Sequence, residues 1–126
     1  MKRPLIRQQV TFLYTDDLAA TSAFYRDVME LEFALDQGPC HIYKLSPTSF
    51  IGLCTLADRP TSPVGVTISL VVDDVDGFHA TLVNKGVTCE RSPAFSERFN
   101  VYSCLFIDPN GYRLEIQEFR DPEWKN

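Results

Sequence analysis

Glu115 stands in the middle of RLEIQEF (113–119), where apolar and polar residues alternate after the turn-forming residues DPNG (108–111). A carboxylate at such a position can be one of several ligands of a metal ion. It can also be a polar anchor or general base in a ligand cavity. A third use is structural, as a group hydrogen-bonded across strands or paired with Arg113, two residues away on the same face. The partners come from other elements, so the stretch alone leaves all three uses open.

The two histidines are the next candidates for chemistry. His41, in PCHIYKL, could be an unexpected metal ligand or a general base, because imidazole changes protonation near neutral pH. Its simpler interpretation is a partly exposed strand residue at a hairpin. His79 follows Phe78 on a predicted helix, where neighbouring side chains point in different directions, so we expect His79 on the solvent side.

The four cysteines are Cys40, Cys54, Cys89 and Cys104. They are widely scattered and form no CxxC pair, so a structural zinc site is not expected. We predict reduced thiols in or near strands, with Cys54 and Cys104 packing as small apolar side chains.

Composition excludes several classes of function. The chain has 126 residues, of which 44% are hydrophobic and 23% charged, as in ordinary globular domains. A net charge of −5 and a pI near 4.9 argue against nucleic-acid binding, which needs a basic face. No apolar run is long enough for a membrane span, and MKRPLIRQQ lacks the apolar core of a signal peptide. We therefore expect a cytoplasmic protein without membrane or nucleic-acid partners.

A strand, two acids and a helix occur twice in the chain. In VTFLYTDDLAATSAFYRDVMELEF, Asp16 or Asp17 can cap a helix whose apolar residues return at three- and four-residue spacing. VTISLVVDDVDGFHATLVNKG repeats this order 57 residues later, with Asp73 and Asp74 before the helix and Gly86 at its end. Further strands are predicted at 41–45, 49–55, 87–89, 101–107 and 112–119. Each half is therefore predicted to be a β-α-β-β-β module.

The predicted fold class is α+β, with two tandem modules forming a curved mixed sheet around a cavity and helices on the outer face. The predicted organisation is a single domain. Its parts are a first module (about 9–56), a linker rich in proline and small polar residues (57–65), a second module (about 66–120) and a polar tail (121–126).

Three stretches resemble the vicinal oxygen chelate superfamily, which contains glyoxalase I, bleomycin-resistance proteins and extradiol dioxygenases. They are DLAATSAFYRDVMELEF (Asp17 to Phe33), VVDDVDGFHATLVNKGV (Val71 to Val87) and FIDPNGYRLEI (Phe106 to Ile116). The resemblance implies a paired β-α-β-β-β fold, usually homodimeric, with its site in a cavity. In metal-dependent members, the first and last strands of each half each supply one ligand.

Carried onto this chain, the four ligand positions are Val10, Gly52, Thr67 and Glu115. Only Glu115 offers a family-type donor, so a complete metal site is not predicted. If Asp16 rather than Asp17 is the reference acid, the first-strand position becomes Gln9 and the count rises to two. No cofactor is therefore predicted. The alternative is a divalent metal held by Glu115 with Gln9 or His41.

The ligand positions implied by the resemblance fix the inward face of each strand, and strand alternation then gives the predicted lining of the cavity. The inward positions are Val10, Phe12 and Tyr14; Phe50, Gly52 and Cys54; Thr67, Ser69 and Val71; and Arg113, Glu115 and Gln117. The predicted ligand-binding residues are Phe12, Tyr14, Phe50, Thr67, Ser69, Arg113 and Gln117. A bulge at the glycine of the 108–111 turn would add Ser103 and Leu105, whereas a plain turn would add Cys104 and Phe106.

This lining suits a small organic molecule with an apolar or planar part and a hydrogen-bonding or cationic part. The predicted function is a homodimer that binds such a molecule without the usual metal site. The alternative is a glyoxalase-like lyase or isomerase, or a dioxygenase, with a non-standard metal site that includes Glu115. A third hypothesis is a metal-free enzyme with Glu115 as its base.

Overall fold

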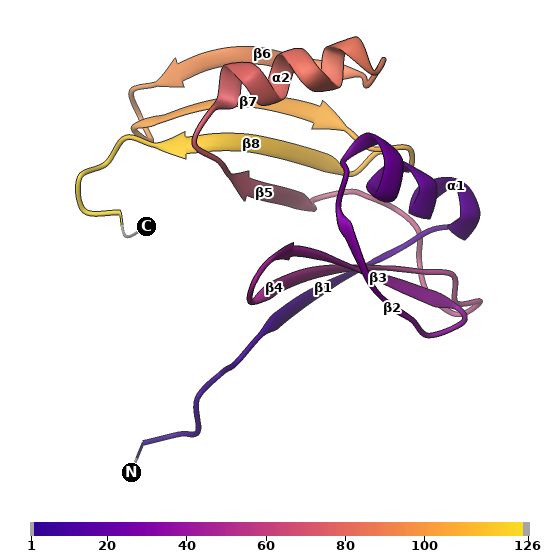
Figure 1. The fold of residues 1–126 in the computed structure, drawn as a ribbon. Helices are drawn as coiled ribbons and strands as arrows, with labels where there is room; N and C mark the ends of the chain where they lie inside the picture. Colours follow the sequence, from indigo (N-terminus) through magenta and orange to yellow (C-terminus); the bar gives the residue numbers. More distant parts are fainter. Residues whose placement is uncertain (1, 125–126) are drawn as a thin grey trace. The chain divides into compact units, whose positions relative to one another are not determined.

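The computed structural model of the protein describes residues 2–124, so the last two residues of the predicted polar tail lie outside the described part. The structure separates into two compact units, Met1–Ser62 and Pro63–Asn126, which contain the first and the second module. Each module has the predicted β-α-β-β-β order, with a mixed four-stranded sheet (Figure 1). The α+β fold class is therefore confirmed.

In the sheet of the first module, the strands lie side by side in the order β1-β4-β3-β2. β1 runs parallel to β4, and the other neighbours are antiparallel. The helix α1 continues directly into a π-helical turn, η1, before the chain returns to the sheet. The elements are β1 (Gln9–Tyr14), α1 (Leu18–Ala23), η1 (Phe24–Val28), β2 (Glu32–Asp36), β3 (Cys40–Ser46) and β4 (Ser49–Cys54).

The second module repeats this topology in the order β5-β8-β7-β6, with β5 parallel to β8. Its elements are β5 (Thr67–Val71), α2 (Val75–Asn84), β6 (Cys89–Ser96), β7 (Val101–Ile107) and β8 (Arg113–Phe119). β6 is longer than the predicted strand 87–89 and continues through Pro93. Proline is tolerated there because β6 is an edge strand, where a backbone N–H need not join the sheet.

The acids that precede each helix act as N-caps. The Asp17 carboxylate accepts the backbone N–H of Ala20 at 3.0 Å, and the Asp74 carboxylate accepts that of Gly77 at 2.9 Å. Asp17 therefore caps the first helix, while Asp16 accepts a 3.4 Å hydrogen bond from Thr61. Such caps satisfy N–H groups that have no partner within the helix.

One face of each sheet packs against the helix of its own module. In the second module this face carries Cys104, Phe106, Leu114 and Ile116, which are fully buried together with Val75 and Leu82 of α2.

The ring of His79 lies 5.6 Å from that of Phe106. The prediction that His79 faces solvent is therefore wrong. His79 follows Val75 by one helical turn and shares its sheet-facing side.

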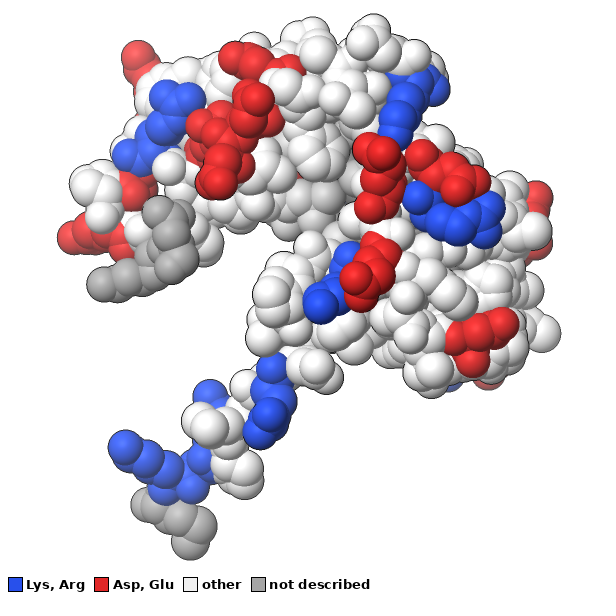
Figure 2. Space-filling model, viewed as in Figure 1, with Lys and Arg blue, Asp and Glu red and all other residues white. Residues whose placement is uncertain are grey.

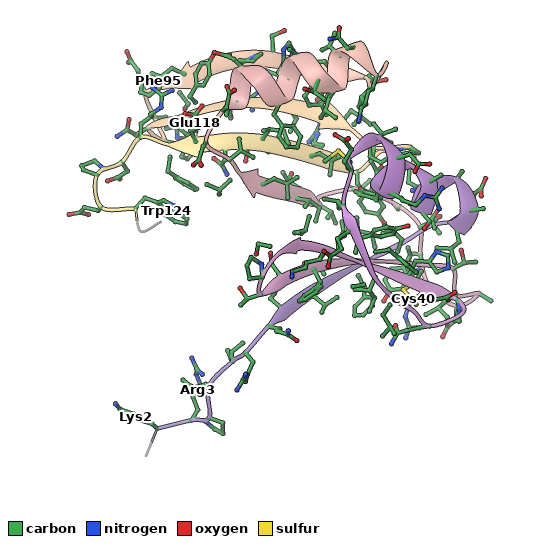
Figure 3. All side chains as sticks on the ribbon, in the orientation of Figure 1. Lys2, Arg3, Cys40, Phe95, Glu118 and Trp124 are labelled. Carbon is green, nitrogen blue, oxygen red and sulfur yellow. A yellow bond between two sulfur atoms is a disulfide. The ribbon has the colours of Figure 1, made fainter. Side chains whose placement is uncertain are left out.

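The prediction of four reduced cysteines is also wrong. Cys40 and Cys54 lie directly opposite each other on β3 and β4 and form a disulfide, which lies beside the Cys40 label in Figure 3. The β3–β4 hairpin brings the pair together although they are distant in sequence. Cys89 and Cys104 are free thiols. Burial raises the pKa of Cys104 to about 11, as expected for a thiol that packs in the core.

The segment before β1 contributes little to either core. Leu5 and Ile6 are exposed, and the basic side chains of Lys2, Arg3 and Arg7 gather along this segment (Figure 2). Within residues 2–124, no helix has the length and apolarity that crossing a membrane requires.

Candidate functional site

Glu115 lies on the helix-free face of the second sheet, the face opposite α2. Its direct neighbours on that face are Ser69 of β5 and Leu105 of β7. The turn between β7 and β8 contains the five residues 108–112, which lie between the paired residues Ile107 and Arg113. Gly111 in this turn has a φ of +91°. The turn is held by Asp108, whose carboxylate accepts the backbone N–H groups of Asn110 and Tyr112. The bulged alternative is therefore confirmed, and Ser103 and Leu105 share the face of Glu115.

Arg91 of β6 is the ion-pair partner of Glu115. Its Nη2 lies 3.6 Å from Oε2 of Glu115, and its Nη1 donates to Oγ of Ser103 at 3.1 Å. The side chains of Glu115 and Arg91 are 25% and 43% exposed, so both can be reached by a ligand. Sequence reasoning missed Arg91 because the predicted strand stopped at Cys89, before the register shifts on either side of Arg91.

The predicted pairing of Glu115 with Arg113 does not form. Arg113 instead contacts Glu90, with Nη2 3.3 Å from Oε1. Both residues line an open pocket of about 330 Å³ in the second module, together with 63–66, Ile107 and Gly111. Arg113 is therefore accessible to a ligand, but its guanidinium already has a carboxylate partner.

Gln117 completes the polar cluster on the helix-free face. Its Nε2 donates to Oγ of Ser69, and the Gln117 side chain is almost fully buried. Thr67 lies opposite Arg113, and Val71 lies opposite Gln117. We call Ser69, Arg91, Ser103, Glu115 and Gln117 the polar cluster. It combines hydrogen-bond donors, acceptors and one ion pair on one face of the sheet, where Ser103 and Gln117 are buried and Ser69, Arg91 and Glu115 can be reached.

The helix-free face of the first sheet is apolar by comparison. The pairs Val10–Phe50, Phe12–Gly52 and Tyr14–Cys54 lie side by side on β1 and β4. Val10 and Phe12 remain 38% and 42% exposed. A ligand could therefore contact them without moving the core.

The residues at the four family ligand positions do not fit a metal ion. Val10 has no donor atom, and a Cβ at Gly52 would lie 2.5 Å from the Phe12 ring, so a ligand side chain there requires Phe12 to move. Thr67 is not a family-type donor, and Glu115 is paired with Arg91. Among residues 2–124, no three His, Cys, Asp or Glu side chains are grouped to hold a metal.

The two alternative ligands also lie away from this face. Gln9 alternates with Val10 along β1, and its amide donates to Oγ1 of Thr11, so it shares the side of Leu13. His41 pairs with Leu53 across β3 and β4. Leu13 and Leu53 belong to the buried core on the helix-covered face.

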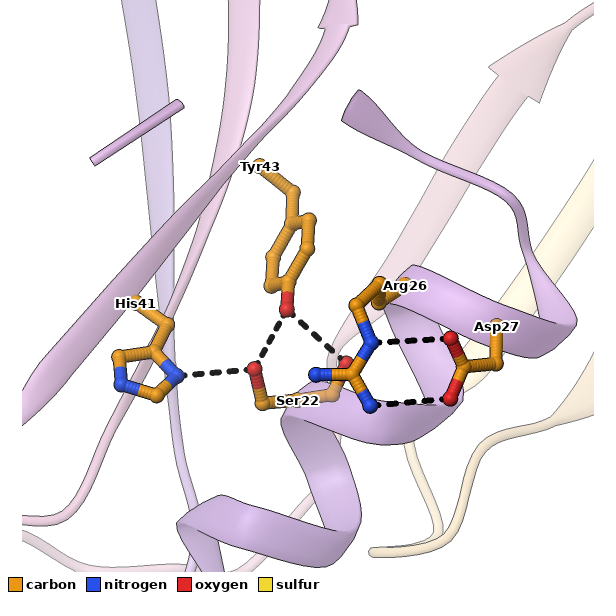
Figure 4. A network of polar contacts seen from close by, with 5 residues as sticks. All are labelled: Ser22, Arg26, Asp27, His41 and Tyr43. Atoms are coloured by element: carbon orange, nitrogen blue, oxygen red, sulfur yellow. Dashed lines mark hydrogen bonds and ion pairs between the residues drawn. The ribbon is translucent and has the colours of Figure 1, made fainter. Parts of the chain in front are cut away.

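His41 belongs instead to a network between β3 and α1 (Figure 4). Its Nδ1 lies 2.8 Å from Oγ of Ser22, and its Nε2 lies 3.6 Å from the Asp36 carboxylate. The hydroxyl of Tyr43 lies 2.5 Å from the same Ser22 oxygen and donates to the Ser22 carbonyl. Ser22 is only 3% exposed, so it cannot attack a ligand, and the network holds the helix on the sheet.

The family model of the glyoxalase/bleomycin resistance protein/dioxygenase superfamily matches residues 7–116. The chain belongs to this superfamily. The family resemblance of the three sequence stretches is therefore confirmed. A search of curated protein sequences finds no match to the chain.

Solved structures share the fold at low sequence identity. A glyoxalase/bleomycin resistance protein/dioxygenase from Nocardioides is 18% identical, with a TM-score of 0.77 over 100% of this chain and 90% of that one. Lactoylglutathione lyase from Agrobacterium tumefaciens is 24% identical, with a TM-score of 0.76 over 98% and 100%. A superfamily member from Sphaerobacter thermophilus is 20% identical, with a TM-score of 0.77 over 90% and 98%. At this identity the likeness shows the fold and leaves the activity open.

Proposed function

We propose that this superfamily member binds a small organic molecule at the polar cluster, without a metal site of the family type. The observation that carries the proposal is the ion pair of Glu115 with Arg91. Glu115 is the single family ligand position that holds a family-type donor. A divalent ion on this carboxylate would lie beside a guanidinium of the same sign of charge, which is unfavourable at such short range.

The polar cluster would orient the ligand. Arg91 offers N–H groups to an acceptor on the ligand, while Glu115 accepts from a donor. Ser69 is exposed and its hydroxyl contains both a donor and an acceptor, whereas the buried Gln117 would hold Ser69 in place through its Nε2 hydrogen bond. Thr67 and Arg113 extend the same face toward the start of β8. The expected polar part of the ligand is therefore an amide, a hydroxyl or a paired donor and acceptor.

The aromatic residues Phe12, Tyr14 and Phe50 of the first module remain predicted ligand contacts from the sequence. Within that module they share the helix-free face of the sheet, and Phe12 is exposed. Burying such a ring against an apolar or planar group removes a large apolar area from water, so we propose that this face contributes affinity for such a group.

The test is a binding screen of small organic compounds by thermal shift, followed by calorimetry in chelator. A ligand present at 100 times its Kd should stabilise the protein by about 2.7 kcal/mol. Glu115→Gln should weaken binding roughly tenfold, because it removes a charge-assisted hydrogen bond. The matched control is Glu97→Gln, because Glu97 is exposed in the same module. This variant should bind the ligand as tightly as the native protein does.

Two outcomes would contradict the proposal. Binding that disappears in chelator and returns with a divalent metal would show that the ligand is held through a metal. Equal binding by Glu115→Gln and the native protein would place the ligand elsewhere. Turnover of a bound compound that survives chelator but is lost in Glu115→Gln would instead identify Glu115 as a catalytic base.

Assembly and location are further proposals. We propose a homodimer, as the family resemblance implies, and light scattering would give its mass. A cytoplasmic location was expected from the sequence, whereas the Cys40–Cys54 disulfide is typical of oxidising compartments. Counting free thiols in protein trapped directly from cells would decide between these expectations.

A further inference from the structure

A second pocket lies at the end of β8 and shares no residue with the polar cluster. Its volume is about 220 Å³, and its lining combines three aromatic rings with two carboxylates: Phe99, Phe119, Trp124, Asp121 and Glu123. Phe119 is the last residue of β8 and pairs with Val101, as Gln117 pairs with Ser103, so Phe119 belongs to the helix-free face. Asp121, Glu123 and Trp124 of the polar tail therefore form part of the pocket wall.

The segment after β8 turns back and places Trp124 on Phe119. The Asp121 carboxylate accepts the backbone N–H of Glu123 at 2.9 Å, and the Asp121 carbonyl accepts that of Trp124 at 3.0 Å. The two rings stack with centroids 3.8 Å apart and planes 16° from parallel. Figure 3 labels Trp124 on this returning segment. The stack fixes the Trp124 ring over the end of β8.

The exposed parts of this pocket attract positive charge. Trp124 and Phe99 are 48% and 66% exposed, so their rings can be reached from solvent. Aromatic ring faces attract cations, and tryptophan does so most strongly. The two carboxylates add a negative field, and among residues 2–124 no lysine or arginine lines the pocket. The Arg98 guanidinium lies 5.2 Å from the Phe99 centroid, so this ring already attracts a cation within the chain, and a bound cation would displace Arg98 from it.

We propose that this pocket binds a small organic cation of the alkylammonium class. The aromatic rings would contact its methyl or methylene groups, while Asp121 and Glu123 would neutralise its charge. The pocket is smaller than the roughly 300–1,000 Å³ of sites for drug-sized ligands, so the cation is a small one. The proposal does not depend on the function of the polar cluster, because the two sites share no residue.

The native protein provides its own optical probe, because Trp124 is the single tryptophan of the chain. Choline chloride should change the Trp124 fluorescence in a saturable way when titrated at constant ionic strength. The neutral carbon isostere of choline, dimethylbutanol, should bind at least several-fold more weakly, because it has the same shape without the charge. Equal binding of the two compounds, or the absence of a saturable choline signal, would overturn the proposal.

Two conservative variants test the carboxylates and one tests the ring. Asp121→Asn keeps an acceptor for the Glu123 N–H while it removes the charge, and Glu123→Gln removes the other charge. Each should weaken choline binding severalfold, and Phe99→Leu should weaken it roughly two- to fivefold through the lost cation–π contact. Asp58→Asn is the matched control, because Asp58 is exposed in the other module.

Melting temperatures identify variants that are merely unfolded. The expected result is weakened choline binding in folded Asp121→Asn and Glu123→Gln, and native binding in Asp58→Asn. Native binding in both Asp121→Asn and Glu123→Gln would refute the assigned role of the carboxylates. The same loss of binding in these two variants and in the control Asp58→Asn would refute it as well.

Discussion

Replacing Cys40 and Cys54 by serine together should destabilise the first module. The disulfide joins residues 14 apart in sequence and closes the β3–β4 hairpin at its open end. Cross-linking reduces the freedom of the unfolded chain, and a loop of about 15 residues corresponds to about 3 kcal/mol in the chain-entropy account. The double variant avoids a single leftover thiol, which could form other disulfides.

The assay compares urea unfolding of the oxidised native protein with that of Cys40→Ser/Cys54→Ser. We expect the free energy of unfolding to fall by about 3 kcal/mol. A parallel thermal scan should show a melting temperature lower by roughly 10 °C for a domain of this size. Cys89→Ser is the control, because Cys89 is a free thiol, and its effect should stay within about 1 kcal/mol.

Thiol counting supplies the independent check. Oxidised protein unfolded without reductant should expose two thiols, those of Cys89 and Cys104, out of four cysteines in the chain. Four reactive thiols in that state would refute the cross-strand pair. An unchanged free energy of unfolding in the double variant would refute the reasoning from loop closure.

Three further predictions concern a cap, a buried thiol and the polar cluster. Asp17→Ala should lower the free energy of unfolding by about 1 kcal/mol through loss of the N-cap, whereas Asp16→Ala should cost less, as urea unfolding would show. The raised pKa of Cys104, about 11 against an ordinary value near 9, means that the folded state holds this proton longer than the unfolded state. The stability contributed by the protonated Cys104 thiol is therefore complete below pH 9 and is lost as the pH rises toward 11. In Cys104→Ala, the free energy of unfolding measured in urea should depend less on pH over this range. Arg91→Met should weaken ligand binding roughly tenfold, and combining it with Glu115→Gln should add little, because the two side chains act as a pair.

Local patterns were sufficient to predict the element order of both modules. Asp17 and Asp74 cap helices that follow alternating strands, and both signals lie within a few residues of the elements they define. The conformation of Gly111 likewise follows from a turn whose residues are adjacent in sequence. Features of this kind depend on short-range chemistry, so the sequence contains enough information to predict them.

The pairings that decide function depend on register between distant strands. Arg91 reaches Glu115 because β6 shifts its register twice, and no local pattern predicts such shifts. Cys40 meets Cys54 because the hairpin sets them opposite each other. The sequence pattern predicts His41 on a strand, and β3 confirms it, but its contact with Ser22 depends on how α1 packs on that strand. Each of these contacts depends on tertiary packing rather than on neighbouring residues.

The central claim is that Glu115 is a paired carboxylate of a binding surface rather than a metal ligand. Its most direct test is the metal content of tag-free protein, measured by mass spectrometry after chelation and re-exposure to nickel, zinc, manganese and iron. We predict that the native protein retains no stoichiometric metal and does not differ from Glu115→Gln, because the ion pair with Arg91 and the missing donors leave no family-type site. A stoichiometric metal in the native protein that is lost in Glu115→Gln would contradict the account.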